Sequence, residues 1–127
     1  MTSVARKRIL IVDDDEGVRD ALEGFLRDWY DVVTAVDGFD GWLRATEAPP
    51  DLIIANVRMP GIDGAEMVDR LRRTESLRRV PVIFMTSAPE TPASGRDSSP
   101  AVRTFLPKPL DPSLVERRVR RALRAPC

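Results

Sequence analysis

Polar residues follow two apolar runs of the sequence, at the points where each run ends. Ile9–Val12 is followed by the acidic cluster Asp13–Asp15, and Leu52–Ala55 is followed by Asn56. Three consecutive aspartates are most often a helix cap with solvated charge. Here both apolar runs are expected to be buried parallel strands, whose carboxyl ends meet at one edge of a sheet and collect ligands there. The acidic cluster and Asn56 are therefore expected to form one site.

Two later strand ends add groups suited to phosphoryl transfer. Thr86 follows the apolar run Pro81–Met85, and Lys108 follows Phe105–Leu106 with one proline between them. A carboxylate can attack phosphorus and form an acyl phosphate, while a lysine and a hydroxyl neutralise and hydrogen-bond the transferred group. Because four strand ends on a common parallel sheet converge, the sequence predicts one pocket with the parts of a phosphoryl-transfer site.

The turn after Asn56 carries the most specific motif of the chain. It reads Val-Arg-Met-Pro-Gly-Ile-Asp-Gly over residues 57–64, and with the aspartate pair and Lys108-Pro109 it resembles the receiver domains of two-component response regulators. The resemblance implies a site for Mg²⁺, donors to a phosphoryl group and a conformational switch. The implied residues are Asp13, Asp14 and the backbone carbonyl of Arg58 for the metal, Thr86 and Lys108 for the phosphoryl group, and Thr86 and Phe105 for the switch.

Asn56 stands where most receivers have the aspartate that accepts the phosphoryl group. An amide nitrogen has its lone pair delocalised and an amide oxygen is neutral, so Asn56 cannot form a stable acyl phosphate. The expected protein is a pseudo-receiver, a phosphorylation-independent interaction module and not an enzyme. Its partner is expected to be a signalling protein or kinase. Mg²⁺ is its one expected cofactor, and Asn56 is expected to weaken the binding of this ion. The alternative is an ordinary phospho-accepting receiver with an engineered asparagine at position 56.

Apolar periodicity predicts strands that alternate with helices around these residues. Strands are expected at 9–12, 32–35, 52–56, 81–85 and 105–106, with helices between them and a last helix capped by Asp111. This alternation indicates an α/β fold, a five-stranded parallel sheet with helices on both faces. The resemblance implies the strand order 2-1-3-4-5. The expected helix stripes are Val18, Ala21, Leu22, Phe25, Leu26 and Trp29; Phe39, Trp42, Leu43 and Thr46; Ala65, Val68 and Leu71; and Val115, Val119, Ala122 and Leu123.

One span does not fit this pattern. Residues 87–100 hold three prolines, one glycine and four serines, which leaves little helix propensity and no apolar face. Receivers place their fourth helix there, so we expect that helix to be shortened or absent and residues 88–100 to be irregular. Because this region belongs to the surface that changes shape in receivers, the altered segment argues against their usual output mechanism.

Composition and charge describe one globular domain with no global electrostatic preference. The 127 residues are expected to form a single domain, with a core from about 7 to 124, and 20 basic residues balance 20 acidic ones. No net field therefore favours nucleic acid or a membrane. The only cysteine is Cys127, and no apolar segment reaches the roughly 20 residues of a membrane span, so a cytoplasmic location is expected.

The last helix carries the main local asymmetry of charge. Glu116 is accompanied there by five arginines, Arg117, Arg118, Arg120, Arg121 and Arg124. An amphipathic helix needs a solvated face of this kind, and no aromatic residue lies between the arginines. Nucleic-acid binding through this helix is therefore a weak alternative, and an acidic protein partner is more strongly favoured.

Overall fold

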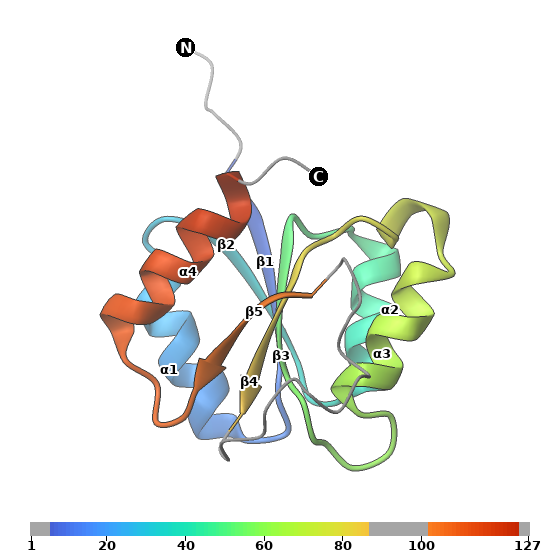
Figure 1. Ribbon diagram of the computed structural model, residues 1–127, viewed down its shortest axis with the longest axis horizontal. Helices are drawn as coiled ribbons and strands as arrows, with labels where there is room; N and C mark the ends of the chain where they lie inside the picture. The colour runs from blue at the N-terminus through green and yellow to red at the C-terminus, as the bar shows by residue number, and fades with distance from the viewer. Residues whose placement is uncertain (1–5, 87–101, 125–127) are drawn as a thin grey trace.

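A parallel sheet of five strands lies at the centre of the computed structural model, which describes residues 6–86 and 102–124 (Figure 1). The strands are β1 (Arg8–Val12), β2 (Asp31–Ala35), β3 (Leu52–Asn56), β4 (Val82–Thr86) and β5 (Val102–Pro107). Their order across the sheet is β2-β1-β3-β4-β5, and each neighbouring pair is parallel. The predicted fold class and strand order are confirmed.

Helices cover both faces of the sheet (Figure 1). The elements are α1 (Glu16–Leu26) and α4 (Pro112–Arg124) on one face, and α2 (Gly38–Glu47), α3 (Gly64–Arg72) and a short 3-10 helix (Glu75–Leu77) on the other. The predicted irregular span 88–100 lies outside the described residues, and so does the position of the helix expected to be shortened. Within 6–86 and 102–124, no helix has the length and apolar character needed to cross a membrane.

Side chains of the central strands alternate between two separate cores. Ile9 and Ile11 of β1 face α1 and α4, whereas Leu10 and Val12 face α2 and α3, and none of the four is more than 2% exposed. This is the two-residue period of a strand, and burial on both faces explains why the sequence there is an uninterrupted apolar run. Polar residues can therefore appear only where the strand leaves the sheet.

Aspartates begin the first three helices. Asp15 caps α1 by accepting hydrogen bonds from two backbone N–H groups of the first turn, at 2.8 and 3.4 Å. Asp37 and Asp63 cap α2 and α3 by accepting from the N–H three residues further on. Within the acidic cluster Asp15 is therefore the helix cap, and Asp14 is exposed at the end of β1.

The inward face of α2 differs from the predicted stripe. Gly41 and Ala45 are buried against the sheet, while Phe39 and Leu43 are 47% and 38% exposed. The reason is close approach, since a Cβ on Gly41 would lie 2.9 Å from a methyl group of Val12. A helix this near to β1 has no room for large side chains beneath it. Spacing alone identified the helix and placed Trp42 correctly, but it wrongly turned Phe39, Leu43 and Thr46 inward.

Trp42 and Trp29, two aromatic residues assigned to helix stripes, have different environments. Trp42 is half-buried and packs against the core of the α2 and α3 face, as expected. Trp29 was expected to continue the apolar stripe of α1, but α1 ends at Leu26 and the Trp29 side chain is 70% exposed. The prediction for Trp29 was wrong because Trp29 lies after the end of the helix, where helical spacing no longer decides which side chains face the core.

Gly64 brings the start of α3 directly against the end of β3. A Cβ at this position would lie 2.6 Å from the backbone oxygen of Asn56 and 2.9 Å from the ring of Phe84. The N–H of Gly64 also donates to the backbone oxygen of Val57 at 2.9 Å. Backbone oxygen cannot move aside as a flexible side chain can, so only glycine fits here without displacing the turn that carries Asn56.

We expect Gly64→Ala to lower the free energy of unfolding by roughly 1–3 kcal/mol, because the new methyl group overlaps fixed backbone. Gly24→Ala is the matched control, since nothing lies within 4 Å of a Cβ at Gly24 in α1. That control should stabilise the protein by about 0.5–1 kcal/mol through helix propensity. Urea unfolding of the two variants measures both values, and equal midpoints would contradict the packing described for Gly64.

Candidate functional site

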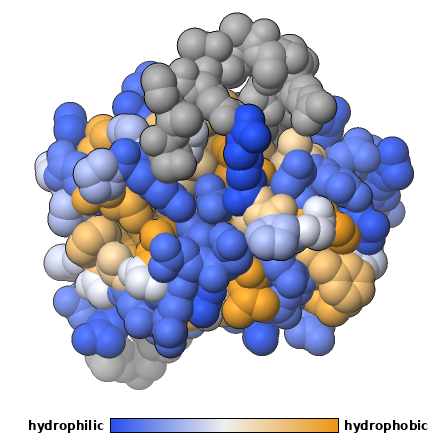
Figure 2. All heavy atoms as spheres, turned by 90° about the horizontal axis from the view of Figure 1, so that it is seen from below, coloured by the Kyte–Doolittle hydropathy of each residue, from blue (hydrophilic) through white to orange (hydrophobic). Residues whose placement is uncertain are grey.

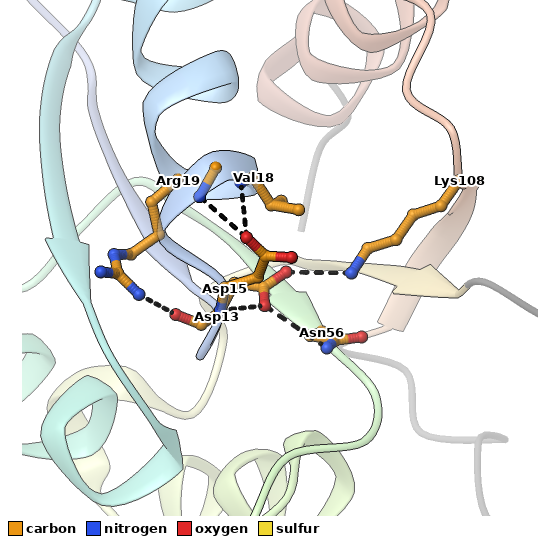
Figure 3. A network of polar contacts seen from close by, with 7 residues as sticks. Asp13, Asp15, Val18, Arg19, Asn56 and Lys108 are labelled. Carbon is orange, nitrogen blue, oxygen red and sulfur yellow. Dashed lines mark hydrogen bonds and ion pairs between the residues drawn. The ribbon is translucent and has the colours of Figure 1, made fainter.

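The carboxyl ends of β1, β3, β4 and β5 meet at one edge of the sheet, the lower edge in Figure 1. Figure 2 looks onto this edge and shows a mostly hydrophilic surface with scattered apolar side chains. Asp13, Asn56 and Lys108 come from three of these ends, and Asn56 and Lys108 each contact Asp13 (Figure 3). Thr86 joins them through the backbone, because its oxygen accepts from the N–H of Lys108 at 2.9 Å. The predicted convergence of strand ends is present.

Asp13 is the centre of this cluster and has no exposed surface. Its Oδ2 lies 3.1 Å from the Nζ of Lys108, and its Oδ1 accepts from the backbone N–H of Asp15 at 2.9 Å. Burial raises the pKa of the Asp13 carboxyl, the hydrogen bonds from Asp15 and Lys108 act in the opposite direction, and the Asp14 carboxyl raises it further. A buried carboxylate is costly unless it is paired, so Lys108 is the group that compensates its charge.

Asn56 occupies the end of β3 with its side chain turned toward Asp13 (Figure 3). Its Nδ2 lies 3.5 Å from Asp13 Oδ1, at the outer limit of a hydrogen bond. The opposite orientation would place the amide oxygen against a carboxylate oxygen, which is repulsive. Asn56 therefore acts toward Asp13 as a neutral donor. A carboxylate in the same place would bring a second negative charge next to the first.

The remaining predicted site residues lie around this cluster. Asp14 is exposed directly after Asp13, and Arg58 is exposed in the turn after β3. Phe105 is half-buried in β5, with its ring centroid 6.0 Å from that of Phe84, and packs against the α2 and α3 core. In the described part of the chain, no three His, Cys, Asp or Glu side chains are grouped as metal ligands.

Arg19 also contributes to the candidate site, and the sequence pattern did not identify it. Its Nη1 donates to the backbone oxygen of Asp13 at 2.7 Å, from the first turns of α1 (Figure 3). This contact ties α1 to the end of β1 and helps to hold the Asp13 backbone in place. The available signal was a basic residue six positions after Asp13. A helix pattern alone does not distinguish such a residue from ordinary solvated charge.

The strand order, the acidic pair after β1, and the lysine after β5 together define a receiver domain. Residues 9–120 match the family model of the response regulator receiver domain, and the chain belongs to this family. The sequence-based resemblance is confirmed at the level of the family. Receiver domains are signalling domains that interact with histidine kinases and other signalling proteins.

Several curated relatives are bacterial transcriptional regulators. The chain is 36% identical over 118 residues to the DNA-binding dual master transcriptional regulator RpaA of Synechocystis sp., covering 92% of this chain and 49% of that protein. It is 34% identical over 119 residues to the alkaline phosphatase synthesis transcriptional regulatory protein PhoP of Bacillus subtilis, covering 93% of this chain and 49% of that protein. The chain thus spans about half the length of these curated relatives.

Solved structures with the same fold cover almost the whole chain. The Vibrio cholerae chemotaxis protein CheY4 superposes with a TM-score of 0.86 at 29% identity, over 94% of this chain and all of that one. The receiver domain of the sensor histidine kinase PA1611 of Pseudomonas aeruginosa has a TM-score of 0.85 at 26% identity, over 95% of this chain and 100% of that one. That domain was solved with a magnesium ion in its active site cleft.

We expect Lys108→Met to lower the free energy of unfolding at pH 7 by roughly 1–3 kcal/mol, because it leaves the buried Asp13 carboxylate without its cation. The side chain of Lys108 is 19% exposed, so solvent recovers part of the loss. In an Asp13→Asn background the same substitution should cost much less. A double-mutant cycle from urea unfolding measures this coupling, and equal losses in both backgrounds would show that the pair contributes nothing.

Asn56→Asp should also destabilise the metal-free protein, by roughly 1–3 kcal/mol, because a new carboxylate would face Asp13 Oδ1 at close range. Asn56→Ser is the control, since it removes the amide without adding charge. Urea midpoints in EDTA test the stability, and a titration with Mg²⁺ should show tighter binding to Asn56→Asp than to the natural chain. An Asn56→Asp midpoint equal to or above that of Asn56→Ser would mean that position 56 is not electrostatically coupled to Asp13.

Proposed function

We propose that this receiver domain works as a protein-interaction module whose state is not set by phosphorylation. The observation that carries the proposal is Asn56 at the end of β3, with its amide directed at the buried Asp13 carboxylate. Phosphoryl transfer to a receiver needs a carboxylate oxygen that attacks phosphorus, and an amide does not supply one. The module therefore catalyses no phosphoryl transfer to itself, and its output depends on binding.

Neither neighbouring aspartate is a good replacement nucleophile. Asp13 is fully buried, and its two oxygens are already engaged by Lys108 and by the N–H of Asp15. Asp14 is exposed and belongs to a different strand end from the turn after Asn56. A phosphoryl group on either residue would lie out of line with the donors that Thr86 and Lys108 supply in this proposal.

Mg²⁺ fits the proposed pocket only weakly. Asp13 and Asp14 are the carboxylates that would hold the ion, with the backbone carbonyl of Arg58, and Mg²⁺ accepts such a set when waters complete its octahedron. Bound there, the ion would supply positive charge beside a phosphoryl group. Asp13 already has a cation in Lys108, and Asn56 adds no charge. These two facts support low affinity, and they agree with a role in which neither metal nor phosphate is required.

Two alternatives remain distinguishable from this proposal. In an ordinary receiver with a substituted aspartate, the natural gene would encode Asp at position 56, and restoring it would restore phosphorylation and its output. Nucleic-acid binding through α4 has less support, because Arg120 is paired with Glu116 and Arg118 donates to the backbone oxygen of Phe105. The whole-protein activity of relatives twice as long gives no reason to assign DNA binding to this span.

We predict that the natural chain takes no phosphoryl group from a small acyl phosphate donor, whereas Asn56→Asp accepts one. In that variant the carboxylate oxygen attacks phosphorus, and the donor's carboxylate leaves with the electron pair of the broken P–O bond. Mass spectrometry after incubation with acetyl phosphate and Mg²⁺ measures the adduct, and peptide mapping locates it. The double variant Asn56→Asp/Lys108→Met is the control and should react much more slowly, because it lacks the cation placed for the developing charge.

An adduct on the natural chain at Asp13 or Asp14 would overturn the proposal. An adduct absent from both forms would retain the interaction role but refute the idea that the pocket lacks only its nucleophile. Phosphorylation of Asn56→Asp, followed by a change in partner binding that the chain with Asn56 never shows, would favour the ordinary receiver with a substituted residue.

A further inference from the structure

A hollow of about 250 Å³ lies between the end of α1 and the middle of α4, and no part of the candidate phosphoryl site lines it. We call this the α1–α4 groove. Because α1 starts beside the carboxyl end of β1 and ends before β2 begins, the groove lies toward the opposite edge of the sheet from Asp13. The two helices run side by side on the same face (Figure 1). The lining residues are Leu26, Trp29, Tyr30, Glu116 and Arg120.

The exposure of Trp29 is the feature of the groove that packing within the domain does not explain. Its side chain is 70% exposed, against 49% for Val36, the next most exposed large apolar residue in the described chain. An indole gains a large free energy from burial, and here most of that gain is unused. Tyr30 beside it is half-buried, and Leu26 beneath it is fully buried. Tryptophan, tyrosine and arginine are the residues most enriched among those that dominate binding energy at protein interfaces.

Positive charge borders the groove on α4. Four exposed arginines recur at helical spacing on its outer face, and Arg120, which lines the groove, forms an ion pair with Glu116. An adjoining hollow of about 480 Å³ shares Tyr30 with the groove and includes three more arginines, with Glu23 and Asp31. The seven arginines are Arg117, Arg120, Arg121, Arg124, Arg6, Arg8 and Arg27. The surface thus combines an aromatic anchor point with a border suited to carboxylates.

We propose that the α1–α4 groove binds an acidic protein segment, with one apolar side chain packed against Trp29 and carboxylates on the arginines of α4. This rests on the proposed function, because it names the surface and the partner chemistry of the interaction module. Glu116 and Asp31 already pair with Arg120 and Arg8, and together with Glu23 they interrupt the positive border. A short acidic segment can place its carboxylates on the arginines of α4 alone, whereas a continuous phosphate backbone would also meet these acidic residues. Strand binding also needs several stacking platforms in series, and Trp29 is the one largely exposed aromatic ring here. These points favour a protein partner over nucleic acid.

The location of the groove has a consequence for regulation. It lies at the end of α1 that is far from Asp13, and its lining residues include none of the cluster formed by Asp13, Asn56 and Lys108. A partner bound there would be retained whatever residue stands at position 56. A receiver domain without a nucleophile could still signal through binding of this kind, because the binding does not depend on phosphorylation.

Selection from a displayed library of random 12-residue peptides tests this directly on the full chain. Enriched peptides are expected to carry excess Asp and Glu with an aromatic or aliphatic residue among them. Their affinity should fall at least about tenfold for Trp29→Ala and for Arg117→Glu/Arg121→Glu, and should weaken with added salt. Because Trp29 is largely exposed, its replacement should leave the urea midpoint nearly unchanged. The matched control is Arg78→Glu/Arg79→Glu, two exposed arginines beyond α3, which should bind as the natural chain does.

Each other outcome has a distinct meaning. Peptides that bind Trp29→Ala equally well, or a selection that enriches none, would overturn the groove as the site. Tight binding of single-stranded oligothymidine that requires Trp29 would replace the protein partner with nucleic acid. Peptides that bind at Trp29 only in phosphorylated Asn56→Asp would support the groove while refuting the phosphorylation-independent function on which it rests. Equal binding by the natural chain and Asn56→Asp, without any donor, is the expected result.

Discussion

The ion pair between Asp13 and Lys108 is the interaction on which the geometry of the candidate site depends. Asp13 is fully buried where β1 ends, and its cation comes from a residue 95 positions later, after β5. The strands β3 and β4 lie between them in the sheet, so the pair forms only when all four strands have the right order and register. A buried carboxylate without its lysine would be expensive, and this penalty favours the native arrangement of the strand ends. Asn56 and Thr86 are positioned by the same requirement.

Sequence reasoning recovered the sheet and the convergence of its ends because both follow from strong local signals. Apolar runs such as Ile9–Val12 have one structural solution in an α/β fold, and polar residues directly after them must lie at a sheet edge. Which face of α2 turns inward was not recoverable from spacing, because Gly41 allows a close approach to β1 that only tertiary structure reveals. Arg19 was missed for the same reason, since its contact is with backbone. The strand order came from the family resemblance and not from periodicity.

The described part of the domain has the receiver fold, and in the function that we propose its site lacks the carboxylate that would accept a phosphoryl group. The fold and the pair Asp13–Lys108 agree with the receiver family, whose model matches residues 9–120. Asn56 places a neutral amide where the chemistry of the family needs a carboxylate. In the proposed function, binding at the surface carries the signal. The exposed Trp29 and the arginines of α4 would supply such a surface, distant from Asp13 and Asn56.

The most direct test of this account uses beryllofluoride, a phosphoryl mimic whose beryllium can take a carboxylate oxygen as its fourth ligand. Backbone amide NMR spectra of the natural chain and of Asn56→Asp would be compared as Mg²⁺ and beryllofluoride are added. The account predicts no change at Thr86, Phe105 or Lys108 in the natural chain, and clear shifts at these residues in Asn56→Asp. Saturable shifts at the same residues in the natural chain would contradict it, because they would show that the pocket reaches the phosphorylated-like state without a carboxylate at position 56.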